Sequence, residues 1–288
     1  MTDGYAGKVL RVDLTSQKIQ EQELSDQVLR KYMGGVGVGA YYLYNEVPPN
    51  TYWSDPKNII IIATGPLTGT SVGGSGSIVV VTKGPLTNGA ASCEANGFLG
   101  AYLKFNGFDG IIISGAANKL SYLSVGKGRI EIRDATHLAG KDTWETERLI
   151  KEELNKGERE LSVFGIGIAG EKLVKFACIF GDKGHVASHN GVGAVMGSKK
   201  LKAIAVERMR SRPPLYDSER LSILAKDLFK KTTQADHDLH YKWGTLGAIV
   251  KAERRLKLGY LPIKNLTTNI FPEGQRLSEE NLRSQAQF

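Results

Sequence analysis

The sequence predicts an α+β fold for residues 1–210 and a helical second domain for residues 211–288. Strand-like and helix-like patterns are mixed along the first part of the chain, without the strict alternation of a doubly wound α/β protein. The stretch from Thr64 to Gly110 carries a glycine at roughly every fourth position, which is typical of repeated tight turns. Glycine becomes scarce after Arg208, where an Arg-Pro-Pro break precedes an amphipathic helix pattern.

The chain opens with a predicted β-hairpin and a short helix. Residues 10–14 alternate apolar and polar side chains, and residues 18–23 are typical of a second short strand. Ser25 can cap a helix that we expect to end at the glycine pair 34–35. Residues 40–44 form a further apolar stretch, which two prolines then break.

Continuous apolar runs predict strands that are buried on both faces. The clearest run is NIIIIA at residues 58–63, and two more follow at residues 77–82 and 110–114. Residues 98–105 carry apolar side chains at helical spacing. The glycine-rich stretch that holds these elements lets backbone N–H groups approach a ligand, yet it lacks the phosphate-loop pattern. It therefore indicates a floor for a flat ligand, the alternative being a β-rich domain with several tight turns.

The second half of the first domain predicts another hairpin, a helix and further strands. Asp142, with Glu145 three residues later, is typical of a capping box that opens a helix through residue 154. The glycines at 165–170 formally match Gly-x-Gly-x-x-Gly, but too few residues follow for the helix of a dinucleotide fold, so we assign no nucleotide site. The predicted hairpin joins residues 120–125 and 129–133 around the turn Gly126-Lys127-Gly128. A strand at 161–164 and an apolar run at 176–180 come next, followed by a glycine turn, short helix and strand within 182–206.

The composition argues against membrane, secreted and nucleic-acid-binding proteins. No apolar run approaches the roughly 20 residues that a spanning helix needs, and the N-terminus lacks the apolar core of a signal peptide. We therefore predict a cytoplasmic protein with no membrane contact. The net charge of +8 accompanies no nucleic-acid motif, so no nucleic-acid partner is expected. Cys93 and Cys178 are too few for a disulfide framework or a metal motif and are expected to be reduced packing residues.

Four motifs occur in order along the first domain. They are YAGKVLRVDL at residues 5–14, ATGPLTGT at 63–70, GFDG at 107–110 and GVGAVMGSKKLKA at 191–203. In these motifs the chain resembles the aldehyde ferredoxin oxidoreductases. The resemblance implies a tungsten or molybdenum enzyme of anaerobic metabolism with a bis-pyranopterin cofactor and a four-iron (4Fe-4S) cluster. Such an enzyme oxidises an aldehyde or related oxo group and passes electrons to a ferredoxin-like acceptor.

The resemblance also implies an architecture. The first domain would consist of two β-sheets related by a pseudo-twofold axis, with the cofactor lying on their saddle-shaped face. Two helical domains would close over the cofactor, and residues 211–288 would begin the first of them as the start of an all-α domain. The glycine-rich floor suits this role, because planar pterins with phosphates need close backbone approach and N–H donors.

The resemblance places cofactor contacts in three glycine-flanked loops of this chain. Where the family commonly has a phosphate-binding arginine this chain has Ser77, and two further expected arginines are His185 and His189. The family's asparagine near a phosphate-bridging magnesium is Glu94 here, which can itself ligate magnesium, and an expected glycine is Asn96. Protonated histidines could still donate to a phosphate. The cofactor-binding residues predicted in this way are Ser75, Gly76, Ser77, Glu94, Asn96, His185, Val186, Ala187, His189, Asn190 and Gly191.

Two functions remain open. The first is the N-terminal part or a split subunit of a tungsten- or molybdenum-pterin, iron–sulfur oxidoreductase, which is not competent for turnover as this chain alone. The cluster cysteines and catalytic residues would then come from downstream sequence or a separate subunit, and no catalytic residue is assigned here. The second is a degenerate, non-catalytic paralogue that serves as a scaffold or binding module in a redox complex. Motif order favours the first, and the lost arginines favour the second.

A partner is expected on either view. The helix predicted at residues 218–231 carries an apolar stripe, yet little apolar periodicity follows it in the sequence. We expect the C-terminal remainder or a separate subunit to cover this stripe, and we expect the protein to be oligomeric. A ferredoxin-like protein is the expected redox partner.

Overall fold

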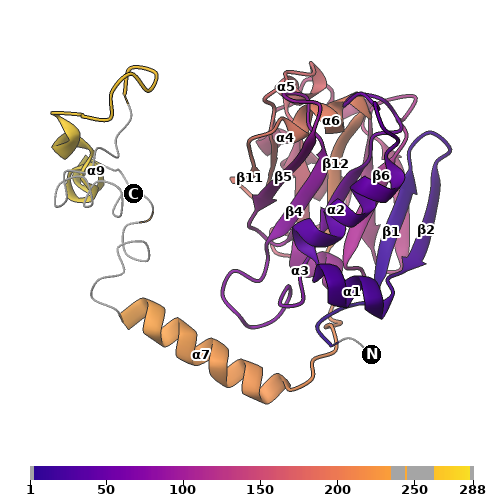
Figure 1. The fold of residues 1–288 in the computed structure, drawn as a ribbon, viewed down its shortest axis with the longest axis horizontal. Helices are drawn as coiled ribbons and strands as arrows, with labels where there is room; N and C mark the ends of the chain where they lie inside the picture. The colour runs from indigo at the N-terminus through magenta and orange to yellow at the C-terminus, as the bar shows by residue number, and fades with distance from the viewer. Residues whose placement is uncertain (1–2, 235–243, 245–262, 286–288) are drawn as a thin grey trace. The chain divides into compact units, whose positions relative to one another are not determined.

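The computed structural model describes residues 3–234, 244 and 263–285 (Figure 1). The chain divides into two compact units, Met1–Ser218 and Glu219–Phe288. This division falls somewhat later than the predicted boundary near residue 210. The assignment of a cofactor-binding domain to residues 1–210 and a helical domain to 211–288 stays a prediction.

The first sheet has six strands in the order β2-β1-β6-β3-β4-β5. Strand β1 pairs in parallel with β6, and every other neighbouring pair is antiparallel. The predicted hairpin and the three apolar runs of the first half all belong to this sheet. Its strands are β1 (Lys8–Asp13), β2 (Lys18–Glu23), β3 (Ile60–Ala63), β4 (Ile78–Lys83), β5 (Ala90–Ala95) and β6 (Gly110–Ser114).

The second sheet repeats the connectivity of the first. Its order, β8-β7-β12-β9-β10-β11, is the first order with six added to each strand number, and again the only parallel pair is the equivalent one, β7 with β12. This repeat is the arrangement that the resemblance implies for two related sheets. The strands are β7 (Ser121–Gly126), β8 (Arg129–Asp134), β9 (Leu161–Gly165), β10 (Ile179–Gly181), β11 (His185–Ala187) and β12 (Leu201–Glu207).

Three apolar clusters organise the layers of the first unit. The largest lies between the two sheets and includes α3 (Leu99–Phe105) and α6 (Val192–Ser198). On its other face the first sheet packs against α1 (Asp26–Tyr32) and α2 (Gly35–Glu46), and the second sheet packs against α4 (Thr143–Glu153) (Figure 1). In strand β3, Ile60 and Ile62 join the inner cluster while Ile61 joins the outer one. The prediction of a strand buried on both faces is therefore confirmed.

Local signals set the ends of the helices. The Val28 N–H donates to Ser25 Oγ at 3.3 Å, and the Glu145 N–H donates to Asp142 Oδ1 at 2.8 Å, so both predicted caps are present. Helix α1 ends at Tyr32, just before the glycine pair 34–35, as predicted. The apolar stretch expected at residues 40–44 belongs to a helix that already begins at Gly35, α2. The Gly-x-Gly-x-x-Gly segment forms only the short helix α5 (Ile168–Glu171), which agrees with the absence of a dinucleotide fold.

Buried lysines explain two of the four sequence motifs. Lys104 forms a buried ion pair with Asp109, the acid of the GFDG motif. Lys199, from the motif at 191–203, donates to the carbonyl oxygens of Asn58, of Pro56 at 3.3 Å and of Gly115 at 3.0 Å. Burial lowers the pKa of Lys199 to about 8. These residues hold the first unit together rather than face a ligand.

The second unit contains the predicted amphipathic helix, α7 (Ser218–Gln234), with η2 (Gly274–Leu277) and α9 (Glu279–Gln285) after it. Most of the apolar stripe of α7 is exposed among the residues that the structure describes: Leu224, Leu228 and Phe229 are at least half exposed, whereas Ala225 is buried. Residues 235–243 and 245–262 lie outside the described part, so the all-α character of this domain stays a prediction. No helix of the described residues has the length and apolarity needed to cross a membrane.

Candidate functional site

The three predicted cofactor loops lie along the contact between the two sheets. Strand β5 forms one edge of the first sheet, β11 forms one edge of the second, and the two strands are in contact (Figure 1). Asn190 Nδ2 donates to the Ser92 carbonyl oxygen at 2.9 Å, and Cys93 Sγ donates to the His189 carbonyl oxygen at 3.3 Å. We call this region, residues 75–77, 92–98 and 182–191, the seam.

The loops of the first half are tied to each other within the seam. The Ser77 hydroxyl donates to Asn96 Oδ1 at 2.7 Å, which joins the turn before β4 to the loop after β5. Gly76 lies so close to the Gly97 carbonyl oxygen that an added Cβ would overlap it. The structure therefore brings residues 75–77 and 94–97 together, although about 20 residues separate them in the sequence.

Glu94 offers an unused carboxylate beside these loops. It lies on β5 opposite Val79 and is exposed. In residues 3–234, 244 and 263–285 its carboxylate has no hydrogen bond or ion pair, and no group of three or more His, Cys, Asp or Glu in that range could hold a metal. A cation at Glu94 would therefore need further ligands that are not carboxylate, imidazole or thiol side chains of the described residues.

The second half contributes strand β11 and the loop that follows it. His185 and His189 are exposed, and Ser188 Oγ lies 3.1 Å from His189 Nδ1. His189, Asn190 and Gly191 have successive φ values of 64°, 54° and 70°. Histidine and asparagine are among the non-glycine residues that adopt this left-handed conformation most often. The hydrogen bonds of Asn190 and of the His189 carbonyl to β5 connect the loop to the first sheet.

Asp182 is a seam residue that the sequence did not single out. Its Oδ2 accepts from the Phe98 N–H at 2.6 Å and from the Ser162 hydroxyl at 2.8 Å. An added Cβ at Gly97 would lie 2.7 Å from the same oxygen. Burial raises the pKa of Asp182, against the opposing effect of the Phe98 hydrogen bond. The sequence shows only an aspartate in a glycine turn, which gives no signal of a contact between the two halves.

Both cysteines lie near the seam and behave as packing residues. Cys93 is buried, Cys178 is half-buried, and both are free thiols. Burial raises the pKa of each thiol, so both stay protonated and unreactive near neutral pH. The prediction of reduced, structural cysteines agrees with this environment.

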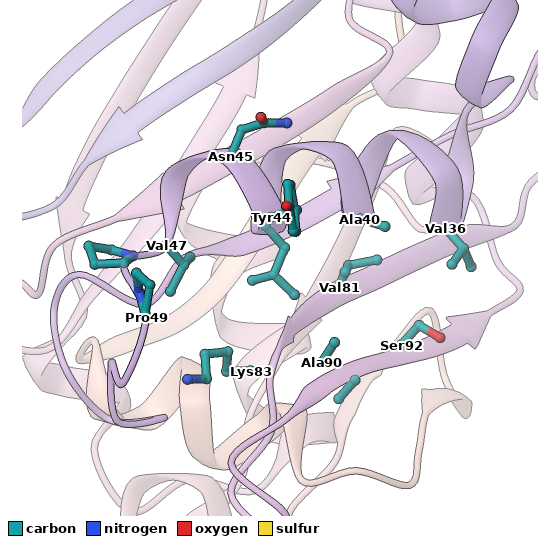
Figure 2. Close-up of a pocket in the computed structure, with 13 residues that line it drawn as sticks. Val36, Ala40, Tyr44, Asn45, Val47, Pro49, Val81, Lys83, Ala90 and Ser92 are labelled. Atoms are coloured by element: carbon teal, nitrogen blue, oxygen red, sulfur yellow. The ribbon is translucent and has the colours of Figure 1, made fainter.

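A groove of about 770 Å³ runs between α2 and β5, with β4 as its floor (Figure 2). Its lining is mainly apolar, with Val36 and Ser92 toward one end and Lys83 toward the other. The Lys83 ammonium donates to the Thr51 carbonyl oxygen at 2.5 Å. Ser92, which lines the groove, also belongs to the seam, whereas none of the predicted cofactor residues lines the groove. A volume of this size is typical of small-molecule sites.

A second cavity, of about 380 Å³, has a different chemistry. Four arginines line it together with Glu160, Glu207 and Met209, namely Arg159, Arg208, Arg210 and Arg212. Glu207 is paired with Lys156, and Arg212 lies 4.0 Å from the centre of the Phe105 ring. None of the predicted cofactor residues belongs to this cavity.

Comparison with known proteins relates this arrangement to one family. Residues 9–208 match the family model described as aldehyde ferredoxin oxidoreductase, N-terminal domain. The chain is 38% identical over 280 residues to the tungsten-containing aldehyde ferredoxin oxidoreductase of Pyrococcus furiosus and 38% identical to that of Thermococcus kodakarensis. Each match covers 96% of this chain and 45% of the relative, so the chain spans less than half the length of these relatives.

Two further similarities involve proteins named as parts of assemblies. The chain is 40% identical over 258 residues to the aliphatic sulfonate oxidoreductase, WOR-like subunit, of Pyrococcus furiosus, covering 84% of this chain and 40% of that one. A solved structure, the active-site complex BamBC of benzoyl coenzyme A reductase with 1,5-dienoyl-CoA, superposes with a TM-score of 0.79 at 35% identity. That match covers 83% of this chain and 36% of the other.

Proposed function

The chain belongs to the aldehyde ferredoxin oxidoreductase family by its N-terminal domain, and from this premise we propose that it is the N-terminal part or a split subunit of a tungsten- or molybdenum-pterin oxidoreductase. The seam is the observation that carries the proposal. Its predicted contact loops come from both halves of a repeated fold and form one continuous surface. A flat cofactor with two phosphate-bearing arms needs such a surface, with backbone and small side chains close to the ligand.

The side chains of the seam suit the phosphate end of a pterin cofactor. Glu94 presents an exposed carboxylate, the oxygen ligand that magnesium prefers, and phosphate oxygens could supply further ligands to the ion. Asn96, His185 and His189 are exposed and can donate hydrogen bonds to phosphate. None of the predicted contact residues is an arginine, so the bidentate guanidinium contact is replaced by weaker donors.

A bound metal-pterin group would supply the two-electron oxidation of an aldehyde or related oxo group. The residues of this chain would bind and orient that group: Glu94 through magnesium, and His185, His189 and the 75–77 turn at the phosphates. The catalytic residues and the four-iron cluster would come from sequence outside this chain's match, in the same polypeptide or in another subunit. The names of two similar proteins, a WOR-like subunit and the BamBC complex, support a multi-subunit setting. A ferredoxin-like protein would then accept the electrons.

One observation favours a second candidate, a non-catalytic paralogue that serves as a scaffold or binding module. The Ser77 hydroxyl, at the position of an expected arginine, is already engaged with Asn96 at 2.7 Å. A residue satisfied within the protein has less to offer a phosphate. On this view the seam keeps its shape but no longer retains the cofactor.

Restoring arginine at two seam positions separates the candidates. The double variant Ser77→Arg with His189→Arg should retain roughly tenfold more pterin and metal than the unmodified chain, because a charge-assisted phosphate contact contributes about 1.5–3 kcal/mol. Pterin is measured by fluorescence after oxidative release, and tungsten and molybdenum by mass spectrometry. Ser16→Arg with Ser71→Arg, which also introduces two arginines but at exposed positions outside the seam, is the matched control. Equal retention by the double variant and this control would remove the phosphate contacts from the seam.

A further inference from the structure

The first unit consists of two halves, one built on each sheet, and at the seam a turn of each half packs against a loop of the other. The β4–β5 turn of the first half packs on the β11–α6 loop of the second, where a Cβ at Gly84 would lie 2.7 Å from the Asn190 carbonyl oxygen. The β10–β11 turn of the second half packs on the β5–α3 loop of the first, where Asp182 reaches Gly97 and Phe98. Each half therefore positions the loop of the other that is predicted to face the cofactor.

The two contacts differ in chemistry. The first is close packing of backbone, whereas the second depends on one partly buried carboxylate that accepts hydrogen bonds from Phe98 and Ser162. The turn between β10 and β11 consists of residues 182–184, and its first residue, Asp182, lies directly against the opposite loop. Asp182 and Lys183 have φ values of 46° and 60°. Consecutive positive φ values suit the tight turn of a β-hairpin, which the Gly184 N–H closes by donating to the Gly181 carbonyl oxygen at 3.2 Å.

We propose that Asp182 is a positioning residue for the cofactor, setting the distance between the contact loops of the two halves; this rests on the proposed function of the seam. Asp182 holds the Phe98 N–H, and its oxygen fills the space where residue 97 would carry a side chain. Gly97 in turn packs on Gly76, and Asn96 accepts a hydrogen bond from Ser77. The position of the loop at residues 96–98 therefore also sets the position of the 75–77 turn. His185, three residues after Asp182, begins β11 in the second half.

Two substitutions at this position separate geometry from charge. Asp182→Asn keeps an oxygen that can accept from Phe98 and Ser162, whereas Asp182→Ala removes it. The alanine variant should exchange the Phe98 backbone amide, which loses its acceptor, at least tenfold faster. It should also retain roughly tenfold to hundredfold less pterin and metal, the range found when a group that orients the ligands of a bound metal is lost. The asparagine variant should stay within a few-fold of the unmodified protein in both respects.

Two controls test whether the effect is specific. Asp134→Ala removes another carboxylate that accepts a backbone N–H, from Thr136 at 2.7 Å, but within its own half. Ile150→Val shortens a buried side chain of the α4 cluster and lowers the thermal midpoint without touching the seam. Neither control should speed exchange at residues 96–98 or reduce pterin retention.

Hydrogen exchange followed by mass spectrometry on the chain, together with pterin content of protein purified from its own cells, gives the decision. Faster exchange with pterin loss in Asp182→Ala alone supports the proposal. Unchanged exchange overturns it, and so does faster exchange with pterin retention equal to that of the unmodified protein, because the residue would then be structural only. If the unmodified chain holds no pterin, the proposed function is wrong, and the positioning role is wrong with it. The exchange data would still show whether Asp182 holds the loop at Phe98.

Discussion

Replacing Asp109 by leucine is expected to lower the free energy of unfolding of the first unit by about 3–5 kcal/mol, because the change leaves a buried charge without its partner. The Lys104 ammonium is fully buried, paired with Asp109, and otherwise donates to the Gly4 carbonyl oxygen at 2.7 Å. Asp109 also accepts the N–H groups of Ala6 at 3.1 Å and Gly7 at 2.7 Å. Burial lowers the pKa of Lys104 even with Asp109 present, so losing the acid makes the charge costlier still.

Urea unfolding at neutral pH measures this effect, and a double variant tests its cause. Lys104→Met with Asp109→Leu removes both charges and should unfold at a higher urea concentration than Asp109→Leu alone. Asp134→Ala, which breaks the exposed pair with Lys119, should change stability little. Two results would contradict this explanation: Asp109→Leu as stable to urea as Asp134→Ala, or the double variant less stable than Asp109→Leu alone. Either would mean that the unpaired Lys104 charge is not what destabilises the first unit.

Replacing Gly97 by alanine should be nearly as damaging and should act on the site itself. Gly97 has a φ of +117°, and an added Cβ would lie 2.7 Å from Asp182 Oδ2, 3.1 Å from Phe164 and 3.3 Å from His185. Left-handed strain and overpacking together should cost roughly 2–5 kcal/mol. Because Gly97 lies in the first half and the groups it would displace lie in the second, the variant should also lose most of the pterin that the protein retains.

A second glycine isolates the contribution of backbone strain. Gly107 also has a positive φ, +88°, but no atom lies within 4 Å of the Cβ that alanine would add. Gly107→Ala should therefore cost only about 1 kcal/mol and leave pterin retention unchanged. Thermal unfolding and pterin content of the two variants are compared side by side. Matching values for Gly97→Ala and Gly107→Ala would mean that the seam tolerates a side chain at residue 97.

Where the fold could be predicted from the sequence, the signal was local. The apolar run at 58–63 and the caps at Ser25 and Asp142 carry their own physical reason, and each predicts its element. Strand β5 gave no such signal, because AASCEA lacks β-branched residues and becomes a strand only by pairing with β4. The glycines of α2 are also misleading, because glycine is unfavourable in a helix interior. Gly39 is needed there because the helix lies directly on Val81, where the Cβ of a larger residue would overlap.

The site could be located but not completed from the sequence. The resemblance selected residues such as Ser77 and His189, and the structure places their loops together, while their role in binding a cofactor stays a prediction. Asp182 was missed for a physical reason: its importance comes from reaching Phe98, 84 residues away in the sequence, across two sheets. The repeated connectivity of the two sheets, which gives each half an equivalent turn against the other, becomes visible only in the strand order.

The most direct test of the central claim is the pterin and metal content of this chain purified without oxygen from its own cells. If the seam is the floor of a bis-pterin site, pterin and tungsten or molybdenum should co-purify with the chain in the ratio of a bis-pterin complex. Both should fall together in Gly97→Ala but not in Gly107→Ala. Chain that is pure and folded, yet free of pterin and of both metals in the unmodified form, would contradict the claim.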